Sequence, residues 1–359
     1  MNKLVISVKK IVEKAIAGER LSFKDGVTLL ESDELILLGL GANSVKTRFH
    51  PEPVITFVID RNINYTNVCQ TKCRFCAFFR SEDAPDAYVL SYEEIFDKIR
   101  ETIECGGTQI LMQGGLHPNL PFTYYLDMLK AIKSRFNIHL HSFSPPEIVH
   151  FSIISGLTVR EVLQQLREAG LDSIPGGGAE ILDNRVRNYI SPLKIPWEDW
   201  MAVMTTAHQL GMKTTATMMF GSVETLEERV MHMIRVRDVQ DLTGGFRAFI
   251  PWSFQPLNTD LGGEAATGFD YLKTLAVSRL MLDNVPNIQA SWVTQGAKMA
   301  QVSLSFGAND FGGTMLEENV VRAAGVSHHV PIDEIIHSIR EAGFKPAQRN
   351  TGYEIIKHY

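Results

Sequence analysis

Three cysteines, Cys69, Cys73 and Cys76, follow one another in the spacing C-x3-C-x2-C. Each thiolate can bind one iron of a cubane cluster, which leaves the fourth iron without a protein ligand. Simple electron carriers usually bind such a cluster with four cysteines, whereas an open iron can bind a further molecule. Structural zinc is the main alternative, but zinc motifs usually bring their ligands as two close pairs, and Cys105 stands apart beside Gly106. We therefore predict a 4Fe-4S cluster with one open iron.

Two glycine-rich segments could present backbone groups to a ligand. Gly114 and Gly115 follow a predicted strand in Gln113-Gly-Gly-Leu-His-Pro118, and the second segment is Pro175-Gly-Gly-Gly-Ala-Glu180. Glycine permits close approach of the backbone to a ligand, but a tight connection or a crowded chain crossing explains such turns equally well. His117 could transfer a proton or simply bond within its turn. For Glu180 the alternative to a binding role is an ion pair with Arg185.

Strand-length apolar runs alternate with helical segments from about residue 63 onward. This alternation is typical of repeated βα units around a parallel sheet. A Ser or Thr three residues before a Glu marks helix starts at Ser91, Thr158 and Thr225. The predicted strands are 63–68, 108–112, 139–143, 173–174, 214–219, 246–250, 288–291 and, with weaker support, 301–305.

These units predict an α/β fold in which a full or partial (β/α) barrel carries the active residues at the carboxyl ends of its strands. Residues 1–50 read as an N-terminal helical extension, residues 51–330 as the barrel, and residues 331–359 as a C-terminal helix and tail packed on it. Strand ends rich in aromatic and amide side chains could line a pocket for a large substrate. Met218 and Met219 are expected to pack rather than to touch a cofactor.

The net charge of −6 and the lack of a long apolar run limit the partners that the chain could have. An acidic protein has no general attraction to nucleic acid, and no stretch reads as a signal peptide or a membrane span. Clustered cysteines suit a reducing compartment, where they bind metal more often than they form disulfides. We expect a soluble, cytoplasmic protein that binds neither nucleic acid nor membrane.

The cysteine loop, with Phe75 in the aromatic position of C-x3-C-x-aromatic-C, resembles that of the radical S-adenosylmethionine (radical SAM) superfamily. The resemblance implies that S-adenosyl-L-methionine binds the open iron and is cleaved to a 5′-deoxyadenosyl radical. It also implies that Phe75 lies against the adenine, that the turn of Gln113, Gly114 and Gly115 holds the methionine ammonium, and that Glu180 accepts from the ribose hydroxyls.

Longer segments, chiefly Ser144-Pro-Pro-Glu147 and the run from Phe249 to Pro256, resemble the cyclic dehypoxanthine futalosine synthases of the futalosine route to menaquinone. Sister families share the cluster loop: the aminofutalosine synthases and the radical enzymes that make the deazaflavin (F420) chromophore. The resemblance implies hydrogen abstraction from the ribose of dehypoxanthine futalosine, ring closure on the benzoate, and loss of one electron and one proton. A low-potential donor such as flavodoxin or ferredoxin would supply the electron that starts the reaction.

The ring closure requires a base, and the chemistry of their side chains makes His117, Glu147 and Asp310 the candidates. Ser144, Arg247 and Ser291 are candidate substrate contacts, Arg247 because the benzoate carboxylate calls for a cation. A structural ion pair explains Arg247 equally well. An alternative of another class is a non-enzymatic iron-sulfur or zinc binding protein, which iron and sulfide analysis would distinguish.

Overall fold

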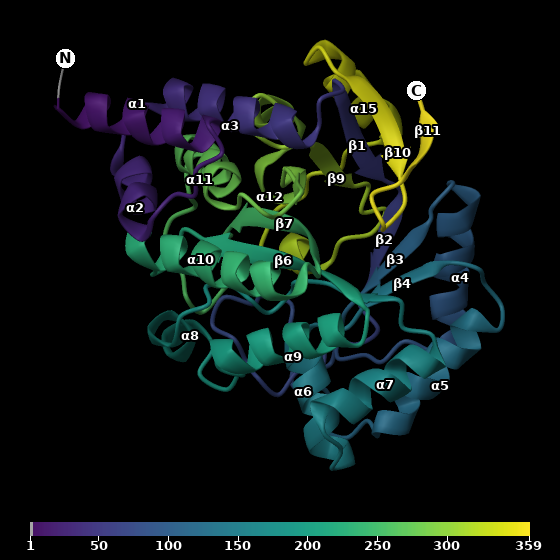
Figure 1. Cartoon of the computed structure of the whole chain (residues 1–359). Helices are drawn as coiled ribbons and strands as arrows, with labels where there is room; N and C mark the ends of the chain where they lie inside the picture. The colour runs from purple at the N-terminus through teal and green to yellow at the C-terminus, as the bar shows by residue number, and fades with distance from the viewer. Residues whose placement is uncertain (1–2) are drawn as a thin grey trace.

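The chain, in a computed structural model, begins with three helices that pack on the barrel (Figure 1). The structure describes residues 3–359, with side chains from Ile6 onward. Helix α3 packs against α11 and α2 against α10, so the N-terminal helices cover the outside of barrel helices. No helix of the described part is long and apolar enough to cross a membrane. The three helices are α1 (Lys3–Ile16), α2 (Phe23–Glu31) and α3 (Leu35–Phe49).

Seven parallel strands form one curled sheet in sequential order. The registers place Asp60 beside Gln109 and His141 beside both Leu111 and Ser173, so polar side chains of neighbouring strands lie at one level of the sheet. Since successive strand residues alternate between the two faces, residues two apart face the same side. The strands are β2 (Asp60–Ile63), β3 (Gln109–Met112), β4 (His139–Ser142), β5 (Ser173–Ile174), β6 (Lys213–Phe220), β7 (Phe246–Ser253) and β8 (Asn287–Ile288).

A second sheet stands beside the gap between the first and last of these strands. Its order is β11-β10-β1-β9, and β1 leads directly into β2. Asp310 bridges to Gln289 just after β8, while the backbone N–H of Leu316 donates to Asp60 in β2 at 3.0 Å. Backbone hydrogen bonds of residues 310–317 thereby link both ends of the seven-stranded sheet. These strands are β1 (Val54–Val58), β9 (Asp310–Gly313), β10 (Lys345–Arg349) and β11 (Ile355–His358).

Helices surround the sheet, and the three predicted capping boxes are confirmed at Ser91, Thr158 and Thr225. A side-chain oxygen at each of these positions accepts from a backbone N–H that the helix itself leaves unpaired. The remaining helices are α4 (Tyr92–Glu104), α5 (Phe122–Lys133), α6 (Pro145–Ser155), α7 (Val159–Ala169), α8 (Asn184–Ile190), α9 (Trp197–Gln209), α10 (Leu226–Thr243), α11 (Gly268–Met281), α12 (Trp292–Gln295), α13 (Ala297–Ser303), α14 (Val320–Ala323) and α15 (Ile332–Glu341).

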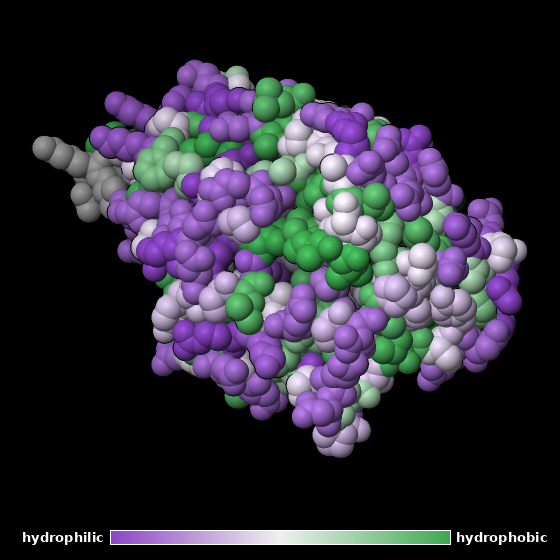
Figure 2. All heavy atoms as spheres, turned by 90° about the horizontal axis from the view of Figure 1, so that it is seen from below, coloured by the Kyte–Doolittle hydropathy of each residue, from purple (hydrophilic) through white to green (hydrophobic). Residues whose placement is uncertain are grey.

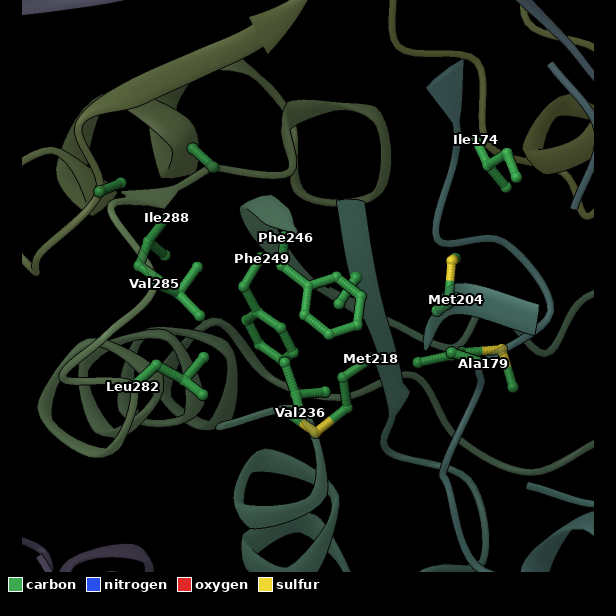
Figure 3. Packing of buried hydrophobic residues seen from close by; sticks show 14 of the residues in the cluster. Ile174, Ala179, Met204, Met218, Val236, Phe246, Phe249, Leu282, Val285 and Ile288 are labelled. Atoms are coloured by element: carbon green, nitrogen blue, oxygen red, sulfur yellow. The ribbon is translucent and has the colours of Figure 1, made fainter. Parts of the chain in front are cut away.

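The core lies between the sheet and these helices. Figure 3 shows Met218 of β6 and Phe249 of β7 packed with Val236 of α10, and both Met218 and Met219 are fully buried, as expected of packing residues. The face in Figure 2 is mostly hydrophilic, with hydrophobic side chains gathered toward its middle. The buried hydrophobic side chains form one continuous core.

Two strand predictions were wrong over most or all of their length. Residues 64–68 lie in a loop that makes only isolated bridges, through Thr66 and Val68, because the ladder of β2 ends at Ile63. Residues 301–305 form the end of α13 and the turn after it, since a five-residue alternation fits a helix end as well as a strand. The strands β1, β9, β10 and β11 were not predicted.

Candidate active site

The three cysteines lie in the long loop between β2 and α4 and line one cavity. All are free thiols, and the hydroxyl of Thr71 lies between two of them, 3.0 Å from Cys69 Sγ and 3.5 Å from Cys73 Sγ. No three His, Cys, Asp or Glu side chains in residues 6–359 converge where one metal ion could bind. A cubane needs a wider arrangement than a single ion, because its three thiolates bind three different irons.

Backbone hydrogen bonds fix the shape of this loop. The N–H of Cys69 donates to the carbonyl of Arg80 at 3.0 Å, and the N–H of Arg80 donates to that of Asn67 at 2.8 Å. The Asn67 side chain also bonds the backbone of Asp86 and Tyr88 at 2.9 Å each. Burial raises the pKa of the Cys76 thiol to about 11, so this group stays protonated until a metal displaces the proton.

The Gly114-Gly115 turn is built against the cysteine loop. A Cβ atom on Gly115 would lie 2.1 Å from the carbonyl oxygen of Val68, so only glycine fits there. The next backbone N–H, of Leu116, donates to Cys69 Sγ at 3.4 Å. The turn and the cysteine loop therefore form one unit, and both line the same cavity.

Glu147 holds this turn from the other side. One carboxylate oxygen accepts from the Tyr65 hydroxyl at 2.6 Å and from the Gly114 N–H at 3.1 Å. The other accepts from the Ser144 N–H at 2.7 Å and from the Ser144 hydroxyl at 2.6 Å, which caps α6. Burial raises the pKa of Glu147, and these hydrogen bonds act in the opposite direction. Glu147 and Ser144 both line the cysteine cavity, but they are engaged chiefly with each other and with the turn.

Glu180 reaches the same cavity from the opposite wall. It is 3 % exposed, has a positive φ of 42°, and forms a buried ion pair with Lys194. The Lys194 ammonium lies 5.1 Å from the centre of the Phe75 ring, so Glu180, Lys194 and Phe75 form one group. Arg185 pairs with Glu228, which excludes the Glu180–Arg185 pair considered from the sequence.

The three consecutive glycines before Glu180 mark a crowded crossing. A Cβ on Gly177 would lie 2.3 Å from the side-chain nitrogen of Gln113, and one on Gly176 would lie 2.7 Å from the backbone nitrogen of Thr217. Gly178 has φ +79° and a Cβ there would meet the Pro146 ring at 2.5 Å. The strand ends of β5 and β6 and the start of α6 thus meet at this turn.

A second cavity of about 270 Å³ lies inside the barrel and adjoins the first. Gln113, Gly177, Trp252 and Val320 line both. Ser291 lines the second cavity, with its hydroxyl 2.9 Å from that of Thr294. Its other polar lining residues include Asp60, Asn62, Gln109, His141, Thr215, Thr217, Gln289, Glu318, Arg349, Thr351 and Tyr353.

Three other candidates from the sequence line neither cavity. The ring nitrogen Nδ1 of His117 accepts from the backbone N–H of Asn119 at 3.1 Å, the turn hydrogen bond that the sequence left open. The buried carboxylate of Asp310 pairs with the Arg349 guanidinium at 2.5 and 3.0 Å. Arg247, near the start of β7, donates to the carbonyl of Thr351 at 3.2 Å.

The sequence analysis did not identify several residues that line the two cavities. Lys194 follows a short helix with no motif around it, and Arg349 and Tyr353 lie in a tail that resembles a surface extension. His141 lies three residues before the Ser144-Pro-Pro-Glu147 segment, and its place two residues after the start of β4 was the available signal. Alternation along that strand would have placed it on the face toward the barrel interior.

Comparison with known proteins places the chain in a family of enzymes. The model of the Radical SAM superfamily matches residues 63–235, and that of the CofH/MqnC C-terminal region matches residues 243–358. The chain also resembles the crystal structure of methylornithine synthase (PylB), with a TM-score of 0.75 at 19 % identity over 94 % of this chain and 97 % of that one. This likeness shows the barrel fold.

Curated relatives cover nearly the whole chain. It is 54 % identical to the cyclic dehypoxanthine futalosine synthase of Halalkalibacterium halodurans, over 99 % of the chain and 96 % of the relative. It is 45 % identical to the 5-amino-6-(D-ribitylamino)uracil–L-tyrosine 4-hydroxyphenyl transferase of Methanopyrus kandleri, over 85 % of each. It is 39 % identical to the aminodeoxyfutalosine synthase of Streptomyces coelicolor, over 98 % of the chain and 94 % of the relative.

Proposed function

The chain belongs to the radical SAM superfamily, and on that basis we propose that it is the enzyme that converts dehypoxanthine futalosine into its cyclic form in menaquinone biosynthesis. The observation that carries the proposal is the end-to-end identity with the Halalkalibacterium synthase, which exceeds the identity with the relatives that run sister reactions. Two joined cavities, one beside the cysteines and one inside the barrel, support it.

Enzymes of this superfamily use an iron-sulfur cluster and S-adenosyl-L-methionine, which together supply a radical able to remove hydrogen from carbon. We propose that Cys69, Cys73 and Cys76 bind a 4Fe-4S cluster. Three free thiols that line one cavity fit that group, because each can bind one of its irons. A flavodoxin or ferredoxin is our proposal for the electron donor.

The residues around the cysteines suit the cosubstrate. The turn of Gln113, Gly114 and Gly115 offers backbone and amide groups beside Cys69, where an amino acid moiety on the open iron would lie. Phe75 offers an aromatic face, and the Glu180 carboxylate can accept from ribose hydroxyls. Lys194 forms a buried ion pair with that carboxylate, so each charge offsets the cost of burying the other.

The barrel cavity suits the substrate, which joins a sugar to a benzoyl ring. Trp252 and Trp292 provide apolar walls, and Asn62 adds a polar amide side chain to the lining. Ser291 offers a hydroxyl in the same cavity, and Ser144 lies in the adjoining one. Of the two arginines, Arg349 lines the barrel cavity and Arg247 does not.

The experiment compares two substrates with one protein preparation. Anaerobically reconstituted protein is given S-adenosyl-L-methionine, a reductant and either dehypoxanthine futalosine or the enolpyruvyl ether that aminofutalosine synthases use. We expect cyclic dehypoxanthine futalosine and 5′-deoxyadenosine from the first and no product from the second. Turnover of the enolpyruvyl ether alone would overturn the proposal. Protein with Cys73→Ala provides the control for reactions that do not need the cluster.

A further inference from the structure

His141 is placed to act on whatever occupies the barrel cavity. Its side chain lines the cavity, and its ring is 7 % exposed there. One ring nitrogen, Nδ1, lies 2.7 Å from the Ser173 hydroxyl. The other, Nε2, has no hydrogen-bond partner among the residues that the structure describes. Because Nε2 is not fully buried, it is open to the cavity that His141 lines.

The hydrogen-bond chain continues beyond Ser173. The same hydroxyl lies 2.7 Å from Nε2 of His139, the residue two positions earlier on β4. Because side chains two apart on a strand face the same side, His139 lies one layer closer to the amino end of the barrel. His141 and Ser173 are buried, whereas His139 is partly exposed. Three side chains therefore connect the cavity to solvent.

We infer that His141 Nε2 takes the proton that leaves the substrate ring after cyclisation, and that Ser173 and His139 pass it out of the barrel. This inference rests on the proposed function. The ring C–H bond breaks, its proton forms an N–H bond at Nε2, and its electron pair stays with the ring. The surplus electron passes to a one-electron acceptor of the iron-sulfur class. Ring aromaticity is thereby restored.

The charges around His141, Ser173 and His139 suit transfer of a proton rather than its storage. Burial lowers the pKa of His141 well below its usual value, and His139, Arg247 of β7 and Arg349 of β10 lower it further. The imidazole is therefore neutral near pH 7 and free to accept at Nε2 when Nδ1–H donates to Ser173. That tautomer is the one that the relay requires.

His139, at the outer end of the hydrogen-bond chain, has different surroundings. Burial lowers the pKa of His139 to about 4, Asp172 next to β5 acts in the opposite direction, and Arg247 and Lys133 of α5 lower it. A proton that arrives at His139 is released readily to water, because the imidazolium is disfavoured there. The three side chains thus lead from the buried cavity to the partly exposed His139.

The test compares His141→Gln with wild type and with His208→Gln as a matched control. His208 is a half-buried histidine whose two ring nitrogens bond threonine hydroxyls, and it lines neither cavity. The measurement is the ratio of cyclic product to 5′-deoxyadenosine, with substrate that carries hydrogen or deuterium at the ring position that is lost. We expect His141→Gln to lower the ratio by about a hundredfold and to raise the deuterium effect, with 5′-deoxyadenosine still formed. His208→Gln should match wild type.

An unchanged ratio in His141→Gln, or an equal loss of both products, overturns the inference. If His141→Gln does not fold, Ser173→Ala takes its place and should lower the ratio more modestly. Nitrogen-15 spectra of the histidines in the cluster-free protein give a second readout, with His141 Nε2 unprotonated in wild type and the shift changed by Ser173→Ala. Protonated Nε2 at neutral pH would also overturn it. Failure of the wild type to form cyclic product would instead reject the proposed function.

Discussion

The Glu147 carboxylate accepts a 3.1 Å hydrogen bond from the backbone N–H of Gly114, and this contact joins the first turn of α6 to the glycine turn beside Cys69. The sequence offered Glu147 as a candidate base. With Tyr65 and Ser144 also bonded to it, the geometry favours a positioning role for Glu147 in the cosubstrate pocket.

Glu147→Gln should weaken both the fold and cosubstrate binding. The amide nitrogen cannot accept a hydrogen bond, so at least one buried donor loses its partner, at a cost of about 1–3 kcal/mol. Urea denaturation of the cluster-free protein measures the first effect and titration of S-adenosyl-L-methionine into reconstituted protein the second. Glu161→Gln is the control, because Glu161 caps α7 in the same way at the surface. Equal losses in the two variants would contradict the positioning role.

Lys194→Met should destabilise the protein far more than a surface lysine variant. Removing one partner of a buried ion pair leaves an uncompensated charge, here on Glu180, and costs about 3–5 kcal/mol. Lys9, which pairs with Glu13 at the surface, provides the control, and Lys9→Met should cost no more than about 1 kcal/mol. A loss in Lys194→Met that is as small as the control's would show that the pair does not stabilise the pocket.

The buried histidines should make the protein less stable in mild acid. Burial lowers the pKa of His208 to about 4 and that of His232 to about 3. Below pH 6.5 the unfolded chain takes up protons that the folded chain does not, so the free energy of unfolding falls as the pH falls from 6.5 toward 4.

His208→Gln removes one of these groups. The pH dependence of the free energy of unfolding should become shallower by about 1.4 kcal/mol per pH unit between pH 6.5 and about pH 5. Urea denaturation at several pH values measures it, with surface His337 replaced by Gln as the control. A variant slope equal to that of wild type would mean that His208 is protonated in the folded protein.

Cys105→Ala should leave the cluster intact. Cys105 is exposed at the end of α4 and lies outside the cysteine cavity. Iron and sulfide content after reconstitution should equal that of wild type, whereas Cys69→Ala, Cys73→Ala and Cys76→Ala should each lose most of the iron. Loss of iron in Cys105→Ala would indicate a fourth protein ligand and a closed cluster.

The elements of the fold that the sequence predicted have strong local signals. The capping boxes at Ser91, Thr158 and Thr225 are local, since each needs only residues three apart. The strands at 108–112 and 173–174 are bounded by turns and rich in apolar or β-favouring residues. By contrast, β10 reads Lys-Pro-Ala-Gln-Arg, and only its pairing with β1 and β11 makes it a strand.

The same distinction holds for the site. The cysteines, Phe75 and the glycine turns share short segments whose spacing carries their chemistry. Lys194 beside Glu180, and Arg349 beside Asp310, come together only through the tertiary fold. His141 lies just before the Ser144-Pro-Pro-Glu147 segment, but its proposed role depends on the Ser173 hydroxyl from the neighbouring strand. Contacts between distant parts of the chain were therefore the part that sequence patterns could not supply.

The electron paramagnetic resonance spectrum of the reduced, reconstituted protein, recorded before and after addition of S-adenosyl-L-methionine, tests the central claim most directly. A 4Fe-4S cluster that Cys69, Cys73 and Cys76 hold by three of its irons, with the fourth iron open, predicts about four irons and four sulfides per chain and a spectrum that changes when the cosubstrate binds. A spectrum that S-adenosyl-L-methionine leaves unchanged, or a reconstituted protein that holds zinc in place of iron, would contradict it.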